Sequence, residues 1–427
     1  MRIKDIRALE ILDSRGNPTL RAYVELENGV VGVSSVPSGA STGIHEAHEL
    51  RDNDTKRYAG NGVLMAKHNI ETEIRTALMG KDPQKQDDID KTMILLDGTP
   101  NKSRLGANAI LAVSLSCATA SARAQNRELY EYLGGFFESP VHTIPVPLIN
   151  VINGGKHAQD SSDFQEYMLI PYGFPRFSEA LRASAEVFHT LKKKLHEDHQ
   201  PTSVGDEGGF APHVPTNEMP LQYLVDAIED ASYMIRSEFG LGIDAAASEF
   251  LIDGKYVLST NNKQLPSDEL SLYYHRLIET YPLCSLEDHF AQDDWKGFQK
   301  LTQEIGETIQ TVGDDLYATN QTRLNRGIIE KTTNAILVKI NQIGTLSETI
   351  SVIKNAKKAG MQTIISHRSG ETEDTFIADL AVASNAGQIK TGSCSRSERI
   401  AKYNRLLEIE HREPHFSYYQ FPYKCLS

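Results

Sequence analysis

The runs Leu283-Cys284-Ser285-Leu286-Glu287, Ile309-Gln310-Thr311-Val312-Gly313-Asp314 and Ala335-Ile336-Leu337-Val338-Lys339 follow one another along the chain. Each is short, largely apolar and closed by a charged residue. Short apolar runs of this kind predict strands that are buried on both faces, as in a parallel sheet. Between such runs lie helical patterns, and Leu270, Tyr273, Tyr274, Leu277 and Ile278 recur at helical spacing after Ser267. Alternating strands and helices therefore predict an α/β fold.

The same alternation extends over residues 145–427, a region of 283 residues. That length suits an eight-stranded β/α barrel, which typically takes roughly 250 residues. An open doubly wound sheet is the alternative. Two helical segments, about 178–197 and 218–238, separate the second strand from the third, so the barrel is expected to start irregularly as strand, strand, helix, helix. The eight predicted strands are Leu148–Ile152, Tyr167–Ile170, Leu241–Ile243, Leu283–Leu286, Ile309–Val312, Ala335–Val338, Thr363–Ile365 and Gln388–Ile389.

The first third of the chain has a different pattern. Residues 19–27 alternate apolar and polar side chains, Asn28-Gly29 follows, and a second run covers Val30–Val36. An Asn-Gly pair between two such runs is a strong β-hairpin signal. Helical patterns near 57–79 and 105–133 complete a small α+β domain. Prolines at 140, 145 and 147 mark its end, so the predicted domains are 1–138 and 145–427.

The composition limits the classes of function. The 427 residues carry 44 Lys and Arg against 57 Asp and Glu, a formal net charge of −13. An acidic surface repels phosphate backbones, so we expect no direct DNA binding. No run reaches the roughly 18 apolar residues that a membrane span needs.

The chain start and the cysteines indicate the compartment. Met1-Arg2-Ile3-Lys4-Asp5 lacks the apolar core of a signal peptide. The cysteines are scattered and form no CxxC motif, which predicts reduced thiols, no zinc site and a cytoplasmic protein. Secretion or display at the cell surface without a signal peptide stays open. The four cysteines are Cys117, Cys284, Cys394 and Cys425.

Charged residues close the last six predicted strands. They are spaced 43, 27, 25, 28 and 23 residues apart, close to one strand–helix unit each after the first. Parallel strands bring these ends to one rim, where barrel active sites lie. One charged residue at a strand end is ordinary. Six successive strands that end in a charged residue, first three acids and then three bases, predict a functional site at this rim. The six residues are Asp244, Glu287, Asp314, Lys339, His367 and Lys390.

The three acids of that rim suggest a metal site. Three carboxylates without a cysteine or a close histidine pair suit a hard, oxygen-preferring cation, with magnesium first and manganese as the alternative. Pairing of the acids with neighbouring lysines is the competing interpretation.

Several longer motifs resemble those of the enolase family, the glycolytic phosphopyruvate hydratases. They are Ser38–Gly43, Gly205–Gly209, Asp314–Leu316, Lys339–Gly344 and Ser366–Asp374, in the family's order. The resemblance runs from Asp13 to about residue 410, and Asp160–Gln165 is closest to bacterial members.

The resemblance implies a lyase of glycolysis and gluconeogenesis that reversibly dehydrates 2-phosphoglycerate to phosphoenolpyruvate through an enolate. A proton must leave a carbon beside a carboxylate that is already anionic, so cations must stabilise the added charge. The resemblance implies two Mg²⁺ ions per active site. Asp244, Glu287 and Asp314 would hold the first, and Ser41 would be the protein ligand of the second, in a loop that closes over the substrate.

The resemblance also assigns the acid and the base. Lys339 takes the role of general base, which requires a pKa lowered by burial and by nearby positive charge. Glu207 takes the role of general acid, and Glu166 is the neighbouring carboxylate expected to raise its pKa. His367 belongs to the same catalytic group.

Further residues match those that bind substrate. Arg368 and Ser369 match a phosphate clamp, Lys390 matches a lysine beside the substrate carboxylate, and His157 matches a histidine on a loop near the phosphate. Glu166, Glu287 and Asp314 are also assigned substrate contacts. The chain departs from the family at Lys156, where serine or glutamate is usual, and at His289, where proline is usual.

Two rival interpretations remain at this point. Another superfamily enzyme, similar to muconate cycloisomerase or methylaspartate lyase, would share the metal acids without the phosphate motif Ser366–Asp374. A non-catalytic or moonlighting binding protein could keep the fold. The resemblance implies a homodimer that acts on a small phosphorylated substrate, with octamers in some bacteria.

Overall fold

The computed structural model describes residues 1–39, 43–158, 161–260, 262–423 and 425. Eight strands close into a barrel, and each of the eight predicted strands is present, which confirms the predicted fold class and excludes an open sheet. Around the barrel the order is β11, β12, β13, β14, β15, β5, β6, β7. The strands are β5 (Val146–Asn153), β6 (Glu166–Ile170), β7 (Gly240–Asp244), β11 (Leu283–Glu287), β12 (Gln310–Gly313), β13 (Ala335–Val338), β14 (Gln362–Ser366) and β15 (Gly387–Lys390).

Strand β6 runs against its neighbours. It pairs antiparallel with both β5 and β7, whereas all other neighbouring pairs in the barrel are parallel. The first residue of β6, Glu166, is therefore opposite Asp244, the last residue of β7, at the rim where the other strands end. After β6 the chain is at the opposite end of the barrel. Two helices, α6 (Phe177–Glu197) and α7 (Met219–Asp230), carry it to the rim and back before β7 begins.

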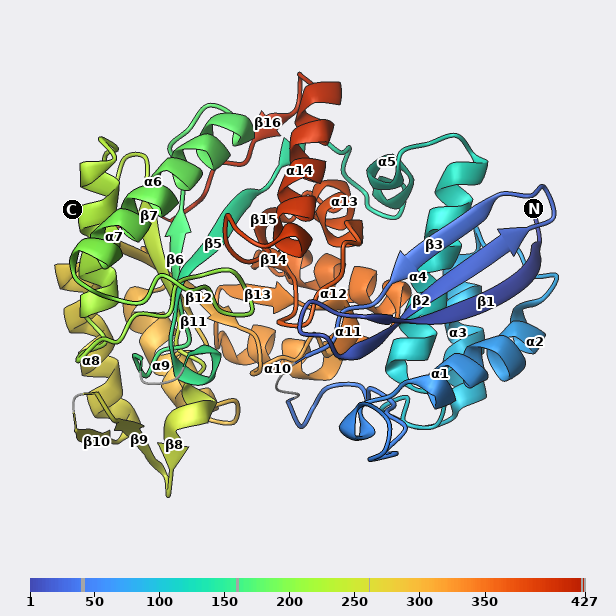
Figure 1. Cartoon of the computed structure of the whole chain (residues 1–427), viewed down its shortest axis with the longest axis horizontal. Coiled ribbons are helices and arrows are strands. Elements are labelled where there is room, and N and C mark those ends of the chain that lie inside the picture. Colours follow the sequence, from blue (N-terminus) through green and yellow to red (C-terminus); the bar gives the residue numbers. More distant parts are fainter. Residues whose placement is uncertain (40–42, 159–160, 261, 424, 426–427) are drawn as a thin grey trace.

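The remaining barrel helices surround the strands (Figure 1). They are α8 (Ser267–Thr280), α9 (Trp295–Ile305), α10 (Gln321–Glu330), α11 (Ile340–Ile343), α12 (Leu346–Lys358), α13 (Phe376–Ala383) and α14 (Ser397–Arg412). Smaller elements are β4 (Thr143–Ile144), η3 (Gly155–His157), η4 (Ala247–Phe250), β8 (Leu251–Ile252), β9 (Lys255–Leu258), β10 (Lys263–Leu265) and β16 (Ser417–Tyr418). Ser267, expected from the sequence to precede this helix as its N-cap, is instead the first residue of α8, and its hydroxyl donates to Asp294.

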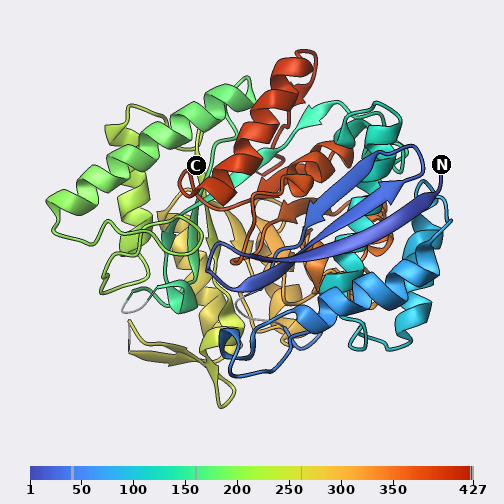
Figure 2. The same ribbon diagram turned by 45° about the vertical axis from the view of Figure 1, so that its right-hand side comes forward.

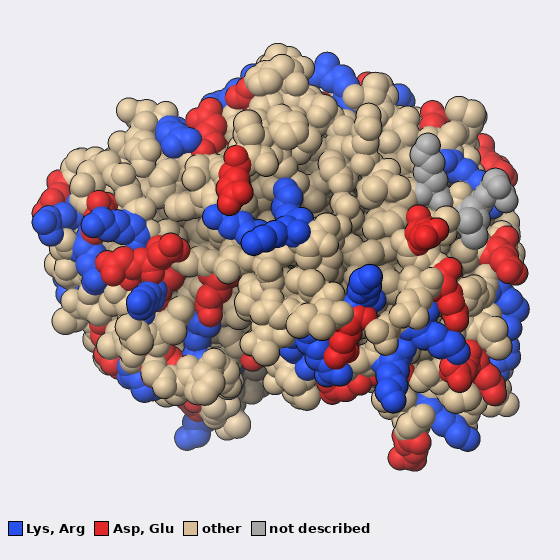
Figure 3. Space-filling view, turned by 180° about the vertical axis from the view of Figure 1, so that it is seen from behind, with Lys and Arg blue, Asp and Glu red and all other residues tan. Residues whose placement is uncertain are grey.

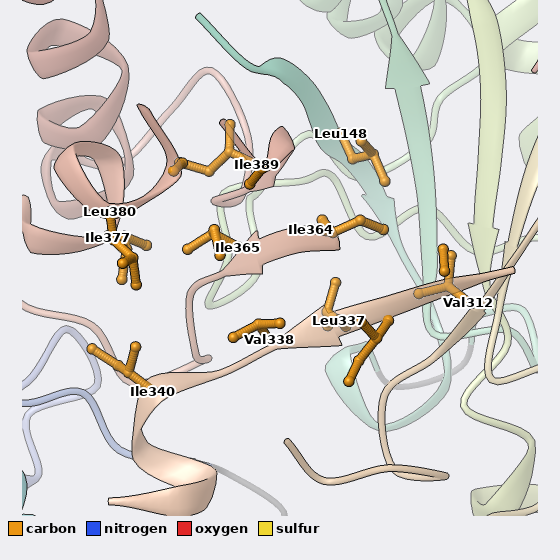
Figure 4. Close-up of a cluster of buried hydrophobic side chains, with 14 of the residues drawn as sticks. Leu148, Val312, Leu337, Val338, Ile340, Ile364, Ile365, Ile377, Leu380 and Ile389 are labelled. Carbon is orange, nitrogen blue, oxygen red and sulfur yellow. The ribbon is translucent and has the colours of Figure 1, made fainter. Parts of the chain in front are cut away.

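Apolar side chains fill the space between strands and helices. Figure 4 shows this packing for Val338 and Ile365 on the strands, on the side of Ile377 and Leu380 of α13. Inside the barrel a polar layer is fully buried: Gln310 donates from Nε2 to Ser285 Oγ (3.1 Å) and to Gln388 Oε1 (2.9 Å). The satisfied amides remove the cost that burying them alone would carry.

The N-terminal region is a three-stranded antiparallel sheet covered by helices. The predicted hairpin is present as β2 (Pro18–Leu26) and β3 (Val31–Ser35), and a strand that the sequence did not reveal, β1 (Ile3–Leu12), pairs with β2. The pattern at 105–133 is divided into α4 (Ala107–Ala124) and α5 (Leu129–Gly134). The other helical elements are η1 (Tyr58–Gly60), α1 (Leu64–Asn69), the π-helical η2 (Ile70–Ile74), α2 (Arg75–Leu78) and α3 (Gln86–Asp97).

The N-terminal region lies against one side of the barrel (Figures 1 and 2). Arg405 of α14 donates to Glu128 (2.9 Å), and Asp90 of α3 accepts from the Ser347 N–H of α12 (2.9 Å). Ser38 and Gly370 exchange two backbone hydrogen bonds. This last bridge brings the segment next to the predicted loop to the barrel rim.

The surface seen in Figure 3 mixes basic and acidic side chains. Among the helices of the described residues, none combines the length and the apolar character needed to cross a membrane.

Candidate active site

The six charged strand-end residues gather at one rim as predicted. Asp244, Glu287 and Lys390 end their strands, while Asp314, Lys339 and His367 directly follow theirs. One pocket at this rim is lined by members of this set together with Glu166, Glu207, His157 and Arg368. Ser41 lies outside the described residues.

Lys390 sits at the centre of a ring of acids. Its Nζ is 3.0 Å from Asp244 Oδ2, 2.8 Å from Glu287 Oε1 and 3.1 Å from Glu166 Oε2. All four side chains are almost completely buried. Burial opposes the charge on Lys390, but the surrounding carboxylates outweigh it and raise its pKa well above the usual value. One lysine therefore faces more negative charge than it can neutralise.

The excess of negatively charged side chains at this rim is suited to binding a cation. Burial raises the pKa of Glu287 well above the usual value, and repulsion from Asp244 raises it further. Its Oε2 is buried without a hydrogen-bond partner among the described residues. A buried, unpartnered carboxylate oxygen between further acids is the donor set that a hard divalent ion prefers. However, each of Asp244, Glu287 and Asp314 also contacts a lysine. The pairing of these acids with lysines, which was the alternative to a metal site, is therefore present as well.

Asp288 is a site residue that the sequence analysis missed. Its carboxylate accepts the backbone N–H groups of Asp314 (2.9 Å) and Asp315 (2.8 Å) and thereby fixes the turn that carries Asp314. Carboxylate oxygens of these three residues lie within 4.8 Å of one another. The only signal in the sequence was that Asp288 follows Glu287 directly.

Glu166 and Glu207 form an acid pair on the other side of the pocket. Ligand atoms of the two carboxylates and His157 lie within 4.8 Å of one another, and Asn150 Nδ2 donates to Glu207 Oε2 (3.0 Å). Glu207 reaches this place because Gly205–Gly209 forms a tight turn, in which the Gly205 N–H donates to the Gly209 carbonyl (2.9 Å).

The proton distribution in this pair is the reverse of the expected one. Burial raises the pKa of Glu166 well above the usual value, and the charge of Glu207 adds to this effect. Burial also disfavours a charged Glu207, but nearby basic groups, led by His157 and including Arg399, bring its pKa well below the usual value. The expectation that Glu166 raises the pKa of Glu207 is therefore wrong, because several basic groups act together on Glu207, whereas Glu207 and Asp244 place negative charge beside Glu166.

Lys339 also differs from expectation. Its Nζ donates to Asp314 Oδ2. Burial lowers the pKa of Lys339, as predicted, but the Asp314 carboxylate outweighs burial and leaves the pKa above the usual value. The predicted lowered pKa is wrong for the protein groups alone, because the predicted metal ligand is also the partner of the lysine.

The tautomer of His367 follows from its neighbours. Arg399 Nη1 lies 2.7 Å from His367 Nδ1, and an arginine only donates, so Nδ1 is the acceptor. The proton of the neutral ring is then on Nε2, which lies 3.6 Å from Glu207 Oε2. Burial, together with the charges of Arg399 and Lys390, holds the pKa of His367 well below the usual value. The sequence analysis did not identify Arg399, a buried residue of α14.

Arg368, the predicted phosphate ligand, is already held by an acid. Its Nη1 donates to Glu46 Oε2 (2.8 Å) and to Asn341 Oδ1 (3.0 Å), and its Nη2 is 3.3 Å from Glu46 Oε1. Both charged side chains are about 95% buried, with 4% and 5% exposed. Glu46 also accepts the Gly43 N–H (3.0 Å). Glu46 therefore links Arg368, part of the predicted phosphate clamp, to the end of the Ser38–Gly43 loop. Ser369, the next residue, lines the same pocket.

His157 belongs to the short helix η3 at the pocket wall. Its Nδ1 is 3.9 Å from both Glu166 Oε1 and Glu207 Oε2. The preceding residue, Lys156, forms an ion pair with Glu249, which also lines the pocket. The unusual lysine thus places a positive charge beside an acid at the pocket wall.

Fold and site together define a class of protein: a β/α-barrel enzyme with an acid-rich rim, built for proton transfer beside a hard cation. Comparison with known proteins then gives the family. Residues 3–133 match a model described as "Enolase, N-terminal domain", and residues 141–420 match "Enolase, C-terminal TIM barrel domain". Curated proteins named "Enolase" from Helicobacter pylori strains J99 and G27 are each 55% identical over 410 residues, which is 96% of each chain.

The chain belongs to the enolase family, and its reaction class is that of a phosphopyruvate hydratase, a carbon–oxygen lyase of glycolysis. This result confirms the resemblance seen in the sequence.

Proposed function

We propose that this chain catalyses the reversible dehydration of 2-phosphoglycerate to phosphoenolpyruvate. The supporting observation is the position of two strands. In the closed order of the barrel, β13 and β6 are four strands apart in either direction, so Lys339 and Glu166 face each other across the rim. Removing a proton from one side of the substrate and the hydroxyl from the other requires a base and an acid placed in this way.

Lys339 acts as the base at the carbon next to the carboxylate. To accept a proton it must first be neutral, so the hold of Asp314 on its ammonium group must weaken. Asp314 would be a ligand of a bound cation, and Lys339 would then lose the partner that raises its pKa. Lys390 remains beside the acids as a fixed positive charge near the substrate carboxylate.

The Glu166–Glu207 pair supplies the acid. The pair holds one proton between two buried carboxylates, and Glu207 delivers it to the departing hydroxyl. His367 lies beside Glu207, with its Nε2 3.6 Å from Glu207 Oε2. In the reverse direction the same groups take a proton from water and add the hydroxyl.

Substrate binding falls to the basic residues of the pocket. Arg368 and Ser369 are proposed to hold the phosphate, and His157 approaches it from η3. An arginine fork suits the two oxygens of a phosphate. Glu46 must release one side of Arg368 or share it with the phosphate.

Two magnesium ions complete the proposal. The first would be held by Asp244, Glu287 and Asp314, and the second would use Ser41. Bound magnesium supplies the positive charge that stabilises an enolate. The buried, unpartnered Glu287 Oε2 supports the first site.

A coupled assay tests the proposed function. The enol product absorbs in the ultraviolet, so its formation from 2-phosphoglycerate is followed with metal, after a strong chelator, and after magnesium is restored. We expect activity to be lost with chelator and recovered with magnesium. Activity that survives chelation would contradict the two-metal proposal.

Three further features are proposed with the function. We propose a cytoplasmic protein with domains at 1–138 and 145–427, as the sequence pattern predicts, and a homodimer, as the family resemblance implies. The four cysteines are free thiols, which supports a reducing compartment. Light scattering on the purified protein measures the assembly, and a monomer mass at micromolar concentration would contradict the dimer.

A further inference from the structure

Two cysteine side chains meet at the end of the barrel opposite the active site. Cys284 is the second residue of β11, whose last residue is Glu287 at the rim. Ser285 points into the barrel, where it accepts a hydrogen bond from Gln310. Because side chains alternate along a strand, Cys284 points outward. It is completely buried there, so another part of the chain covers it.

The covering segment is the C-terminal tail. After α14 the tail pairs as β16 with β4, and Tyr418 donates from its hydroxyl to the Pro171 carbonyl (2.7 Å). Phe421 then stacks on Tyr172, with ring centres 5.6 Å apart and planes within 9°. These contacts direct the tail to the base of the barrel and deliver Cys425 there.

Cys425 lies directly against the start of β11. Its Sγ is 2.9 Å from the carbonyl of Pro282 and 3.7 Å from the hydroxyl of Tyr172. Gly240 on the neighbouring strand β7 leaves the space that both sulfurs share. A Cβ at Gly240 would lie 2.5 Å from Cys284 Sγ and 3.0 Å from Cys425 Sγ.

We propose that Cys284 and Cys425 form a dithiol redox site that closes to an intramolecular disulfide on contact with a low-molecular-weight disulfide. Neither thiol belongs to the catalytic machinery, and the inference is independent of the proposed function. The other two cysteines do not share this arrangement. Cys117 lies in α4, and Cys394 precedes α14.

The chemistry of the two thiols is unequal, as stepwise exchange requires. Cys425 is 8% exposed against 0% for Cys284, so it is the first to meet an oxidant. A hydrogen bond from Cys284 lowers the pKa of Cys425 to about 7, and burial raises the pKa of Cys284. A thiolate is the attacking species in exchange, which assigns the first step to Cys425.

The reaction balances with one equivalent of the small disulfide. The Cys425 thiolate attacks one sulfur of the small disulfide, which breaks its S–S bond and releases one thiol. Cys284 then loses its proton and attacks Cys425 Sγ, and the second small thiol leaves. The protein is oxidised by two electrons, and the small disulfide is reduced to two thiols.

The bond would tie the tail to a barrel strand. The segment that it closes, from 284 to 425, contains strands β12 to β15 with Asp314, Lys339, His367 and Lys390. Closing a long segment restricts the unfolded chain, which raises the free energy of unfolding in the chain-entropy view. The oxidised protein should therefore melt at a higher temperature than the reduced protein.

Oxidised glutathione tests the proposal on the full-length protein. After incubation, thiols are counted in denaturant and peptides are mapped by mass spectrometry without reduction. We expect two of the four thiols to be lost, no glutathione mass on the protein, and a peptide that links Cys284 to Cys425. The melting temperature should rise and return when a reductant is added.

Matched variants separate this site from general oxidation. The Cys425→Ser variant starts with three thiols and should form no internal disulfide, so it should either keep all three thiols or carry one glutathione. The Cys117→Ser and Cys394→Ser variants should each still lose two thiols to the internal disulfide. Because the linked peptide is sought in the wild-type protein, the result does not depend on how any variant folds. Four remaining thiols, a stable glutathione adduct on Cys425, or a disulfide between two chains would overturn the proposal.

Discussion

At the scale of single residues, Glu166 and Glu207 hold one proton across the pocket from Lys339. This arrangement predicts a separable effect of two variants. Lys339→Ala should abolish exchange of the substrate α-proton with solvent, because no other placed group takes that proton. Glu207→Gln should leave this exchange in place and lower dehydration by about 10²- to 10⁴-fold, the usual contribution of a general acid.

Exchange is measured by NMR in deuterated water and dehydration by the ultraviolet signal of the product. Both variants should melt near the wild-type temperature, which serves as the control for folding. If the two variants lost exchange to the same extent, the assignment of acid and base would be wrong.

His289 gives a second residue-scale prediction. The ring is fully buried among Tyr274, Phe290 and Phe298, and neither nitrogen has a partner among the described residues. Burial lowers its pKa to about 3 from a usual value near 6.5. As the pH falls below 6.5, the unfolded chain binds a proton that the folded protein excludes, so this residue makes the folded state less stable down to about pH 3.

His289→Phe cannot titrate and should lack this loss. Relative to wild type, the variant should therefore gain stability as the pH falls below 6.5, at about 1.4 kcal/mol for each pH unit. Urea unfolding at pH 7 and pH 5 measures the difference. An equal free-energy difference at the two pH values would show that His289 is solvated or hydrogen-bonded in solution.

At the scale of elements, β3 and α4 pack closely together at Gly32. A Cβ at this position would lie 2.1 Å from the Ser116 carbonyl oxygen and 2.3 Å from the Ala120 nitrogen, both of helix backbone. Gly32→Val should therefore lower the free energy of unfolding by roughly 1–3 kcal/mol, the usual cost of overpacking. Arg7→Ala, at an exposed position of β1, is the control and should change it by less than about 0.5 kcal/mol. Equal effects of the two changes in denaturant would contradict this packing.

The sequence predicted most elements because their signals are local. The eight barrel strands are short apolar runs between helical patterns, and their length and their alternation with helices identify them. The direction of β6 was not predictable, because a strand has the same pattern in either direction. Strand β1 was missed for a related reason: its buried positions (Ile3, Ile6 and Ala8) do not follow a strict alternation.

The candidate site was also predictable only in part. Charged residues at strand ends, such as Asp244 and Lys390, could be found because strand topology brings them together. Glu46, Asn150 and Arg399 come from a loop, a strand interior and a helix, and only the folded chain places them at the pocket. The pKa expectations for Lys339 and Glu207 were wrong because the pKa depends on all the charged groups that surround each side chain in the fold, and sequence spacing does not give those neighbours.

At the scale of the whole molecule, several buried or partly buried polar contacts join the N-terminal region to the barrel. Asp90 to Ser347, Glu128 to Arg405 and Ser38 to Gly370 all cross this boundary. We therefore expect the two proposed domains to unfold together. The single tryptophan, Trp295 in α9, reports on the barrel alone, whereas far-ultraviolet circular dichroism reports on all helices.

Both signals should give the same denaturation midpoint in urea, as in a cooperative transition. A dichroism midpoint clearly below the fluorescence midpoint would mean that the N-terminal region unfolds first. Activity measured along the same titration should be lost with both signals.

The reversal of β6 also limits how this barrel can be rebuilt from parts. A regular barrel can exchange one strand–helix unit for another, because each unit returns the chain to its starting side. Here β6 alone returns the chain to the base of the barrel, and the pair α6 and α7 then starts and ends at that base. A graft that kept only one of these two helices would leave the chain at the rim, the wrong end for β7 to begin, so α6 and α7 should be exchanged together.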